Sequence, residues 1–351
     1  MTCRVLRAIA FVLGILLVTA TADAGSPARV GFLCAMSGPS AHTREFQRGL
    51  RELGYVEGKN IVIEYRFADG DLARFRAFAD EMVRLKVDVI VAASTAAIGP
   101  ARDATREIPI VMAQSDDPVG AGFVASLARP GGNITGLSTL AAELSGKRLE
   151  LLKQAVPGLS RVAVLWNTAN AFGGALLRET EAAARVVGVR VRPVGVQHLS
   201  DLEGAFSAMI RDGTNGLIVQ PDMMFFENRS QLLGLAARRR LPAVYEEREW
   251  AEAGGLIAYG PSYNDLFRRS ASFVDKILKG AKPFGLPVEQ PSRFDLFINL
   301  HTAKALGLTM PQSLLVRAEH VIMKAPVARA PAANPCAAKN PCAVRNPCGW
   351  K

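Results

Sequence analysis

Short apolar segments alternate with helical patterns along most of this chain. The apolar runs 87–92 (VDVIVA), 108–113 (IPIVMA) and 161–166 (RVAVLW) are closely followed by polar residues, as buried strands of parallel sheets are. Residues 71–85 place their apolar side chains at helical spacing instead. Repeated strand–helix units predict parallel sheets covered by helices on both faces, so the predicted fold class is α/β.

The alternation restarts near residue 140, which predicts two doubly wound parallel-sheet lobes. We assign residues 25–139 plus 261–290 to the first lobe, and 140–260 plus 291–323 to the second. The elements after residue 260 are too few for a third domain, so we interpret them as hinge crossings that complete both lobes. Lobes joined by several crossings form a clamshell that can close around a ligand.

The first 24 residues have the features of a cleaved signal peptide. Arg4 and Arg7 precede an apolar run at 9–19, and Ala-Asp-Ala at 22–24 fits a cleavage site after Ala24. The run is too short to favour a membrane-spanning helix, although a retained anchor is the alternative. Cys3 precedes the apolar run, which argues against a lipid anchor at that cysteine. We therefore expect an exported, periplasmic protein.

The last segment, 324–351, is rich in Ala, Pro and Asn and ends in a six-residue repeat, NPCAAK-NPCAVR-NPCGWK. It has too few apolar residues to form a core and is predicted to be disordered. Its cysteines, Cys336, Cys342 and Cys348, are spaced more loosely than the ligands of a structural zinc site. They could instead form disulfides in an oxidising compartment. Cys34 is predicted to be a buried free thiol.

Charge and motifs exclude several classes of function. Five basic residues and no acidic ones lie in the tail, so the tail carries half of the formal charge of +10. The rest of the chain has no helix-turn-helix signature or basic arm, so nucleic acid is not an expected partner. Its histidines have no metalloprotease spacing, and neither a nucleophile elbow nor a phosphate-binding loop occurs. We expect a monomer with no catalytic residue, no metal and no cofactor.

Polar residues at the ends of predicted strands are the candidate ligand contacts. Asp116 and Asp117 follow the apolar run 110–113, and ligands of open α/β sheets lie beyond the carboxyl ends of strands. A pair of carboxylates there could bind an amine. Capping of a helix is the alternative, and one of the two could cap while the other faces the cleft.

The full set of candidates shares a strand-end position or an aromatic side chain close to one: Ser37, Ser94, Thr95, Asp116, Asp117, Asn167, Asp222, Phe225, Tyr245, Glu246 and Tyr259. Phe226 and Tyr263 are further candidates for apolar walls. For each member alone, a turn or capping role explains the residue equally well. The prediction therefore depends on the whole collection and its common place at the cleft between the lobes.

Six segments together carry a resemblance to a known family: 54–71 (GYVEGKNIVIEYRFADGD), 108–118 (IPIVMAQSDDP), 129–136 (RPGGNITG), 147–152 (KRLELL), 277–283 (ILKGAKP) and 298–315 (INLHTAKALGLTMPQSLL). The chain, over about 30–322, resembles the ABC transporter substrate-binding proteins of the periplasmic-binding type I fold. The similar subgroup includes tryptophan/tyrosine-binding lipoproteins. The chain departs from that pattern in lacking a lipid-anchor cysteine and in carrying the repeat tail.

The resemblance implies that a ligand is clasped between the lobes and delivered to an inner-membrane ABC permease. It also implies that Asp117 pairs with a ligand ammonium. Ser94 matches the hydroxyl residue that the family has after its third strand, and Asp222 matches the family's aspartate at a strand end of the second lobe. We predict a periplasmic solute-binding component of an ABC importer, with a small polar ligand such as an amino acid or related amine. The alternatives are an exported module that presents ligand to a receptor, and a secreted enzyme.

Overall fold

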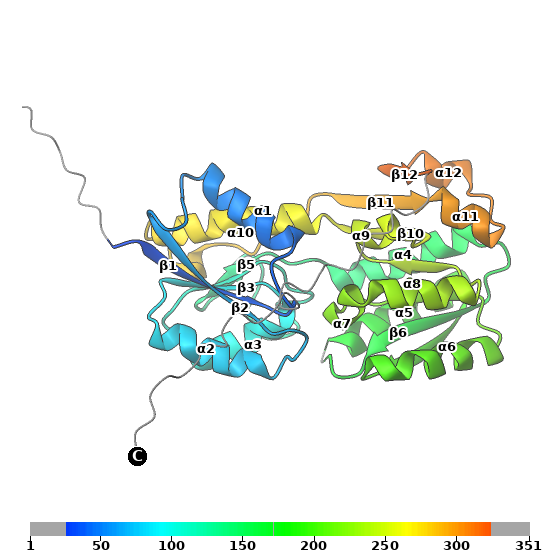
Figure 1. Ribbon diagram of the computed structural model, residues 1–351, viewed down its shortest axis with the longest axis horizontal. Helices are drawn as coiled ribbons and strands as arrows, with labels where there is room; N and C mark the ends of the chain where they lie inside the picture. The colour runs from blue at the N-terminus through cyan, green and yellow to red at the C-terminus, as the bar shows by residue number, and fades with distance from the viewer. Residues whose placement is uncertain (1–25, 171, 324–351) are drawn as a thin grey trace, which may run out of the picture.

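Two α/β lobes lie side by side in the computed structural model, which describes residues 26–170 and 172–323 (Figure 1). The predicted signal peptide at 1–24 and the repeat tail at 324–351 lie outside the described residues. Within the described part of the chain, no helix combines the length and apolar character that crossing a bilayer requires. The α/β fold with two parallel-sheet lobes, predicted from the strand–helix alternation, is confirmed.

The first lobe is built on a parallel sheet in the order β2-β1-β3-β4-β5. Its strands are β1 (Ala28–Cys34), β2 (Ile61–Phe67), β3 (Val89–Ala92), β4 (Ile110–Met112) and β5 (Ile134–Gly136). Every residue of β3 and β4 is buried, which explains their continuous apolar sequence. The strands all run in one direction, so their carboxyl ends meet at one edge of the sheet.

Helices cover both faces of this sheet (Figure 1). They are α1 (Ala41–Glu52) and α10 (Tyr263–Leu278) on one face, and α2 (Arg74–Arg84) and α3 (Thr95–Ala104) on the other. Helix α1 begins at a capping box made by Ser40 and packs closely against α10. Gly49 permits this approach, because a Cβ atom there would overlap the backbone carbonyl of Arg268.

The second lobe contains a sheet in the order β12-β11-β10-β9-β8-β6-β7. Its strands are β6 (Arg161–Asn167), β7 (Arg190–Val196), β8 (Gly216–Val219), β9 (Ala243–Tyr245), β10 (Ile257–Pro261), β11 (Phe294–Asn299) and β12 (His320–Ile322). Its helices are α4 (Ala141–Ala155), α5 (Gly173–Val187), α6 (Leu202–Arg211), α7 (Met223–Glu227), α8 (Arg229–Arg238), α9 (Arg248–Glu252), α11 (Leu300–Leu306) and α12 (Gln312–Leu315), with a 3₁₀ turn η1 (Leu199–Asp201).

One pair of neighbours in this sheet, β10 and β11, is antiparallel. The chain leaves the second lobe after β10, forms α10 and the 3₁₀ turn η2 (Pro283–Gly285) against the first lobe, and then returns as β11. It also passes from the first lobe to the second between β5 and α4. We keep the breaks at 139/140, 260/261 and 290/291 as the proposed boundaries between the lobes.

Candidate functional site

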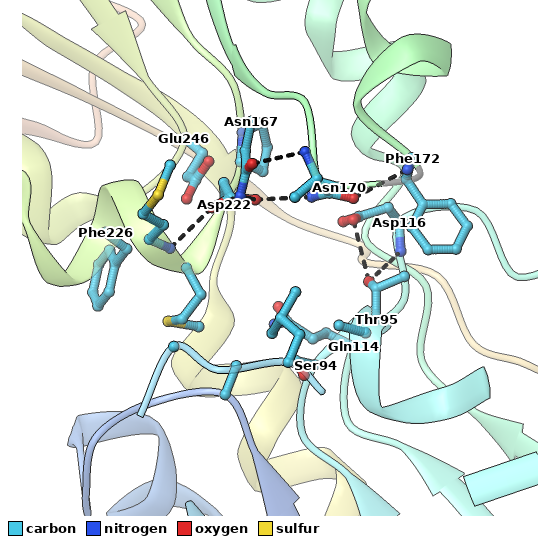
Figure 2. Close-up of a pocket in the computed structure, with 18 of the residues that line it drawn as sticks. Ser94, Thr95, Gln114, Asp116, Asn167, Asn170, Phe172, Asp222, Phe226 and Glu246 are labelled. Atoms are coloured by element: carbon cyan, nitrogen blue, oxygen red, sulfur yellow. Dashed lines mark hydrogen bonds between the residues drawn. The ribbon is translucent and has the colours of Figure 1, made fainter. Parts of the chain in front are cut away.

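A cavity of about 410 Å³ lies between the lobes, where the carboxyl ends of strands from both sheets face each other. The first lobe lines it with residues that follow β1, β2, β3 and β4, and the second with residues that follow β6, β8 and β9. Figure 2 shows polar groups from both lobes directed into this space. The cavity therefore depends on the two lobes together.

The N-terminus of α3 forms part of the first lobe's wall. Ser94 occupies the N-cap position, but its side chain does not cap the helix. Its hydroxyl is buried and has no hydrogen-bond partner among the described residues. The first backbone N–H groups of a helix also lack partners within the helix. This corner of the cavity therefore offers hydrogen-bond donors to an anionic or polar group.

Asp116 is the first lobe's carboxylate in the cavity wall (Figure 2). Thr95 Oγ1 donates to its Oδ2 atom at 3.2 Å, and Thr139 Oγ1 donates to its Oδ1 atom at 3.3 Å. The Asp116 N–H group also donates to Thr95 Oγ1, at 3.2 Å. Burial raises the pKa of Asp116, and the two hydroxyl groups only partly oppose this effect. A cation from the ligand would stabilise the charged form.

Asp222 is the corresponding carboxylate of the second lobe, at the N-cap of α7. The side-chain amides of Asn167 and Asn170 donate to it, at 3.2 Å and 3.0 Å respectively. The backbone N–H of Met224 donates to Oδ1 at 2.9 Å. Burial raises the pKa of Asp222 as well, against the effect of these donors.

Glu246 follows β9 and is only 5% exposed, although it carries a carboxylate. Burial, together with the nearby Glu247, raises its pKa well above the ordinary value. The charge that opposes this effect is Arg148, which is fully buried on α4 and donates from Nε to the Tyr259 carbonyl at 2.8 Å. Arg148 lies behind the cavity wall. No lysine or arginine is among the described residues that line the cavity itself.

Apolar side chains complete the cavity. Phe123 from the first lobe and Phe172 from the second lie with ring centroids 6.0 Å apart, so this pair spans the cleft. Phe226 and the neighbouring Met223 and Met224 line the wall formed by α7. An apolar or aromatic group of a ligand would therefore be enclosed by groups from both lobes.

The structure brings six of the predicted site residues into the cavity wall: Ser94, Thr95, Asp116, Asn167, Asp222 and Glu246. Phe226 and Tyr263, predicted as apolar walls, also line it. Each of the six lies at or just after the carboxyl end of a strand, as the sequence reasoning assumed.

The structure does not bring Asp117 or Ser37 to the cavity. The Asp117 carboxylate accepts the Gly120 N–H at 2.7 Å, which makes it a turn residue. Of the two adjacent acids, Asp116 faces the cavity. Ser37 is exposed, and its N–H donates to Glu227 Oε1 of the second lobe at 2.7 Å. Ser37 thus contacts the other lobe outside the cavity.

Three predicted aromatic residues also lie outside the cavity wall. Phe225 is completely buried in the core of the second lobe. Tyr245 is 1% exposed and stacks on Trp250, with ring centroids 4.5 Å apart. Tyr259 on β10 packs toward Phe294, at 6.3 Å between centroids. All three side chains pack within the second lobe. Side chains of a strand or helix alternate between core and surface, so a place near a strand end does not by itself bring them to the cavity.

Sequence reasoning did not select several polar residues that line the cavity, namely His42, Gln114, Asn170 and Glu247. Gln114, Asn170 and Glu247 lie in the same strand-end loops as selected residues, so including each whole loop would have found them. His42 lies on the buried face of helix α1 and not at a strand end, so the strand-end rule could not select it.

Sequence comparisons find a family and a relative that match this chain. The family described as ABC transporter substrate binding protein matches residues 29–322. A curated relative named "Tyrosine-binding protein", from Clostridioides difficile (strain R20291), is 28% identical over 263 residues, which are 75% of this chain and 75% of that protein.

Solved structures show the same similarity. The ABC domain in complex with L-Trp from Streptococcus pneumoniae is 27% identical, with a TM-score of 0.79 over 85% of this chain and 100% of that one. The ligand-free, open structure of a substrate-binding protein with adhesive properties from Clostridium difficile is 26% identical, with a TM-score of 0.63 over 85% and 100%. The fold is that of type I periplasmic binding proteins. The chain therefore belongs to the ABC transporter substrate-binding protein family.

Proposed function

We propose that this protein binds an amino acid with an apolar or aromatic side chain between its lobes, as the periplasmic component of an ABC importer. The observation that carries the proposal is the placement of Asp116 and Asp222, which come from opposite lobes and face one cavity (Figure 2). Its partner would be an inner-membrane ABC permease, and export would follow cleavage after Ala24.

Asp116 is the group best suited to the ligand ammonium in the first lobe. Its two oxygens accept one hydroxyl each, and a carboxylate can accept further hydrogen bonds. An ammonium would supply both the missing donors and the opposite charge. The absence of lysine and arginine among the described lining residues favours a ligand that brings its own cation. Asp222 can bind the same ammonium from the second lobe.

The ligand carboxylate would lie at the N-terminus of α3. The unpartnered Ser94 hydroxyl and the free N–H groups of the first turn are donors that suit an anion. The ligand side chain would then extend between Phe172 and Phe226. A relative named for tyrosine binding and a structure solved with L-Trp support a ligand of this class.

Contacts from both lobes would make the ligand favour the closed form. A ligand shifts a conformational equilibrium only by its difference in affinity for the two states. Asp116 belongs to the first lobe and Asp222 to the second, so one ligand can reach both carboxylates only when the lobes are close together. A ligand that contacts both is bound fully only when the cleft is closed.

Native mass spectrometry of the protein purified from the periplasm, followed by denaturing release, tests the proposal first. We expect an amino acid to be released intact, and the mass of the polypeptide to begin at Gly25. Calorimetry should then show binding of L-tyrosine, L-tryptophan or L-leucine. Tyramine, which lacks the carboxylate, and 3-(4-hydroxyphenyl)propanoate, which lacks the amine, are the matched controls. Equal binding of either control and the amino acid would contradict the proposed contacts.

A further inference from the structure

Three side chains that can ligate metals meet where the lobes touch, beside the cavity. They are His42 on α1 of the first lobe, and Glu247 and Glu249 at the start of α9 in the second; His42 and Glu247 also line one side of that cavity. One ligating atom from each lies within 4.8 Å of the others. The role proposed for the amino-acid site uses none of these three groups.

The distance between the His42 and Glu247 side chains is that expected for two ligands of one metal ion. His42 Nε2 lies 3.3 Å from Glu247 Oε2. That oxygen is buried, yet it accepts no hydrogen bond from any described residue, and Glu247 as a whole is only 7% exposed. Two ligands bound to zinc at 2.0–2.2 Å in a tetrahedron are about 3.4 Å apart. The two atoms form an ion pair when His42 is protonated, and their spacing is also that of two ligands of one ion.

The surroundings hold the imidazole in place. The His42 ring is 6% exposed and stacks on Phe267, with 4.9 Å between ring centroids and 15° between planes. Phe226 stacks at 6.0 Å from the opposite lobe. A ligand whose orientation is set by packing loses little freedom when a metal binds.

The surroundings also provide space and negative charge. A cavity of about 80 Å³ adjoins the three residues, with room for water ligands. Its lining includes further acidic or imidazole groups, Glu246, Asp295 and His320. The positive group in the lining, Arg248, is paired with Glu252 at 2.6 Å. Asp295 is paired with Arg293 at 3.0 Å and Glu246 has Arg148 nearby, so Glu247 and Glu249 are the carboxylates that a dication would neutralise.

We propose that His42, Glu247 and Glu249 form a binding site for Zn²⁺ that joins the two lobes, with water as a further ligand. One imidazole and two carboxylates form a nitrogen–oxygen set that suits zinc. Because the ligands come from both lobes, the ion stabilises the closed arrangement. By linkage, zinc and any ligand that needs closure then raise each other's affinity. The zinc site itself does not depend on the identity of the organic ligand.

The test is a calorimetric titration of the full chain with Zn²⁺ alone, after a chelator has removed any bound metal. Cys336, Cys342 and Cys348 are replaced by serine in every sample, since thiols in the tail could bind zinc themselves. We expect one ion per chain. Substitution of the half-buried Glu249 by glutamine should weaken binding at least tenfold, a typical effect of disturbing a metal site. His42→Asn should do the same from the other lobe.

The matched controls are Glu203→Gln, an exposed acid on α6, and His301→Asn, on α11. Both should bind zinc as the parent does. Co²⁺ should give the visible absorption of a low-symmetry site, and Glu249→Gln should abolish that absorption. Failure of the parent chain to bind zinc, or equal binding by the parent, Glu249→Gln and His42→Asn, would overturn the proposal. The pair would then be a simple contact between the lobes.

Discussion

The two lobes present the same chemical group to the cavity but hold it differently. In the first lobe, Asp116 is bonded by the hydroxyl groups of Thr95 and Thr139. In the second lobe, Asp222 is bonded by the amides of Asn167 and Asn170 and by a backbone N–H group. Both carboxylates follow a strand of a parallel sheet, so their position is equivalent while their partners are not.

This difference separates the roles of the two acids. A hydroxyl group can donate or accept, so it is compatible with either a carboxylate or a neutral acid. An amide N–H can only donate, so the partners of Asp222 favour the charged form. Burial raises the pKa of both acids, so the difference lies in their partners. The donors around Asp222 match only its charged form, whereas the hydroxyl groups around Asp116 can follow a change of protonation. The closed site thus combines one acid with fixed donors and one with adaptable partners.

The largest expected effect concerns Arg148, the buried positive charge behind the part of the cavity wall that the second lobe forms. Arg148→Met should lower the free energy of unfolding by about 3–5 kcal/mol, because it leaves buried carboxylates without their compensating charge. Burial lowers the pKa of Arg148, and the Glu246 carboxylate opposes this shift. Urea unfolding at neutral pH measures the effect.

The control for this prediction is Arg238→Met, which removes an exposed pair with Glu203 and should cost less than about 1 kcal/mol. Adding Glu246→Gln to Arg148→Met should restore part of the loss. Similar small losses in both single variants would mean that Arg148 does not compensate the acids.

The second prediction compares adjacent acids of the first lobe. Asp116→Ala should weaken amino-acid binding by about 1.5–3 kcal/mol, or roughly 10- to 150-fold in Kd, since a charged hydrogen bond is lost. Asp117→Ala should leave Kd nearly unchanged, because that carboxylate accepts the Gly120 N–H in a turn. Calorimetry decides between them. A larger loss of affinity in Asp117→Ala than in Asp116→Ala would show that Asp117 binds the ligand ammonium, as the family resemblance implied.

The third prediction tests the contrast between hydroxyl and amide partners. Asp222→Asn should lower the free energy of unfolding by about 1–3 kcal/mol, since its new amide group faces amide donors that then lack acceptors. Asp116→Asn should be neutral or stabilising in the empty protein, because Thr95 and Thr139 can reorient and a buried charge is removed. Thermal unfolding without ligand measures both. Equal losses would show that the two acids are held alike.

The fourth prediction concerns pH. The pKa of Asp116 is raised in the folded protein, so its contribution to stability is complete below the unfolded pKa and is lost as pH rises through the raised value. The advantage of Asp116→Asn over the parent should therefore be greatest near neutral pH and shrink on acidification. Thermal unfolding across this pH range measures it.

Ligand affinity should respond to pH in the opposite direction. Protonation of Asp116 removes the charge that binds the ammonium, so Kd should rise by up to about tenfold per pH unit below the raised pKa. Asp117→Ala is the control and should keep the parent's profile. An affinity that does not change on acidification would argue against an ionised Asp116 in the complex.

The sequence patterns located the long elements well because those elements bury a periodic face. Helix α1 buries Phe46 and Leu50 on one side, and every residue of β3 is buried. The segments α7, α9, α12 and β12 were not predicted. Each has only three to five residues, too few to show a period.

The candidate site was predicted less completely. The strand-end rule found Asp116, Asp222 and Glu246, because it depends only on where parallel strands end. It could not choose between Asp116 and Asp117, which share that position and differ in the direction of their side chains. It also selected Tyr245 as a ligand contact, whereas its packing on Trp250 places it in the core.

The sequence by itself determined the strand–helix alternation, the division into two parallel-sheet lobes and the concentration of polar residues at strand ends. These features depend on local periodicity and on the end of each apolar run. Only the tertiary structure decided which acid faces the cavity, that β11 returns antiparallel to β10, and that His42 meets Glu247 across the lobes. These depend on turn geometry and on contacts between residues far apart in the sequence, which no local pattern encodes.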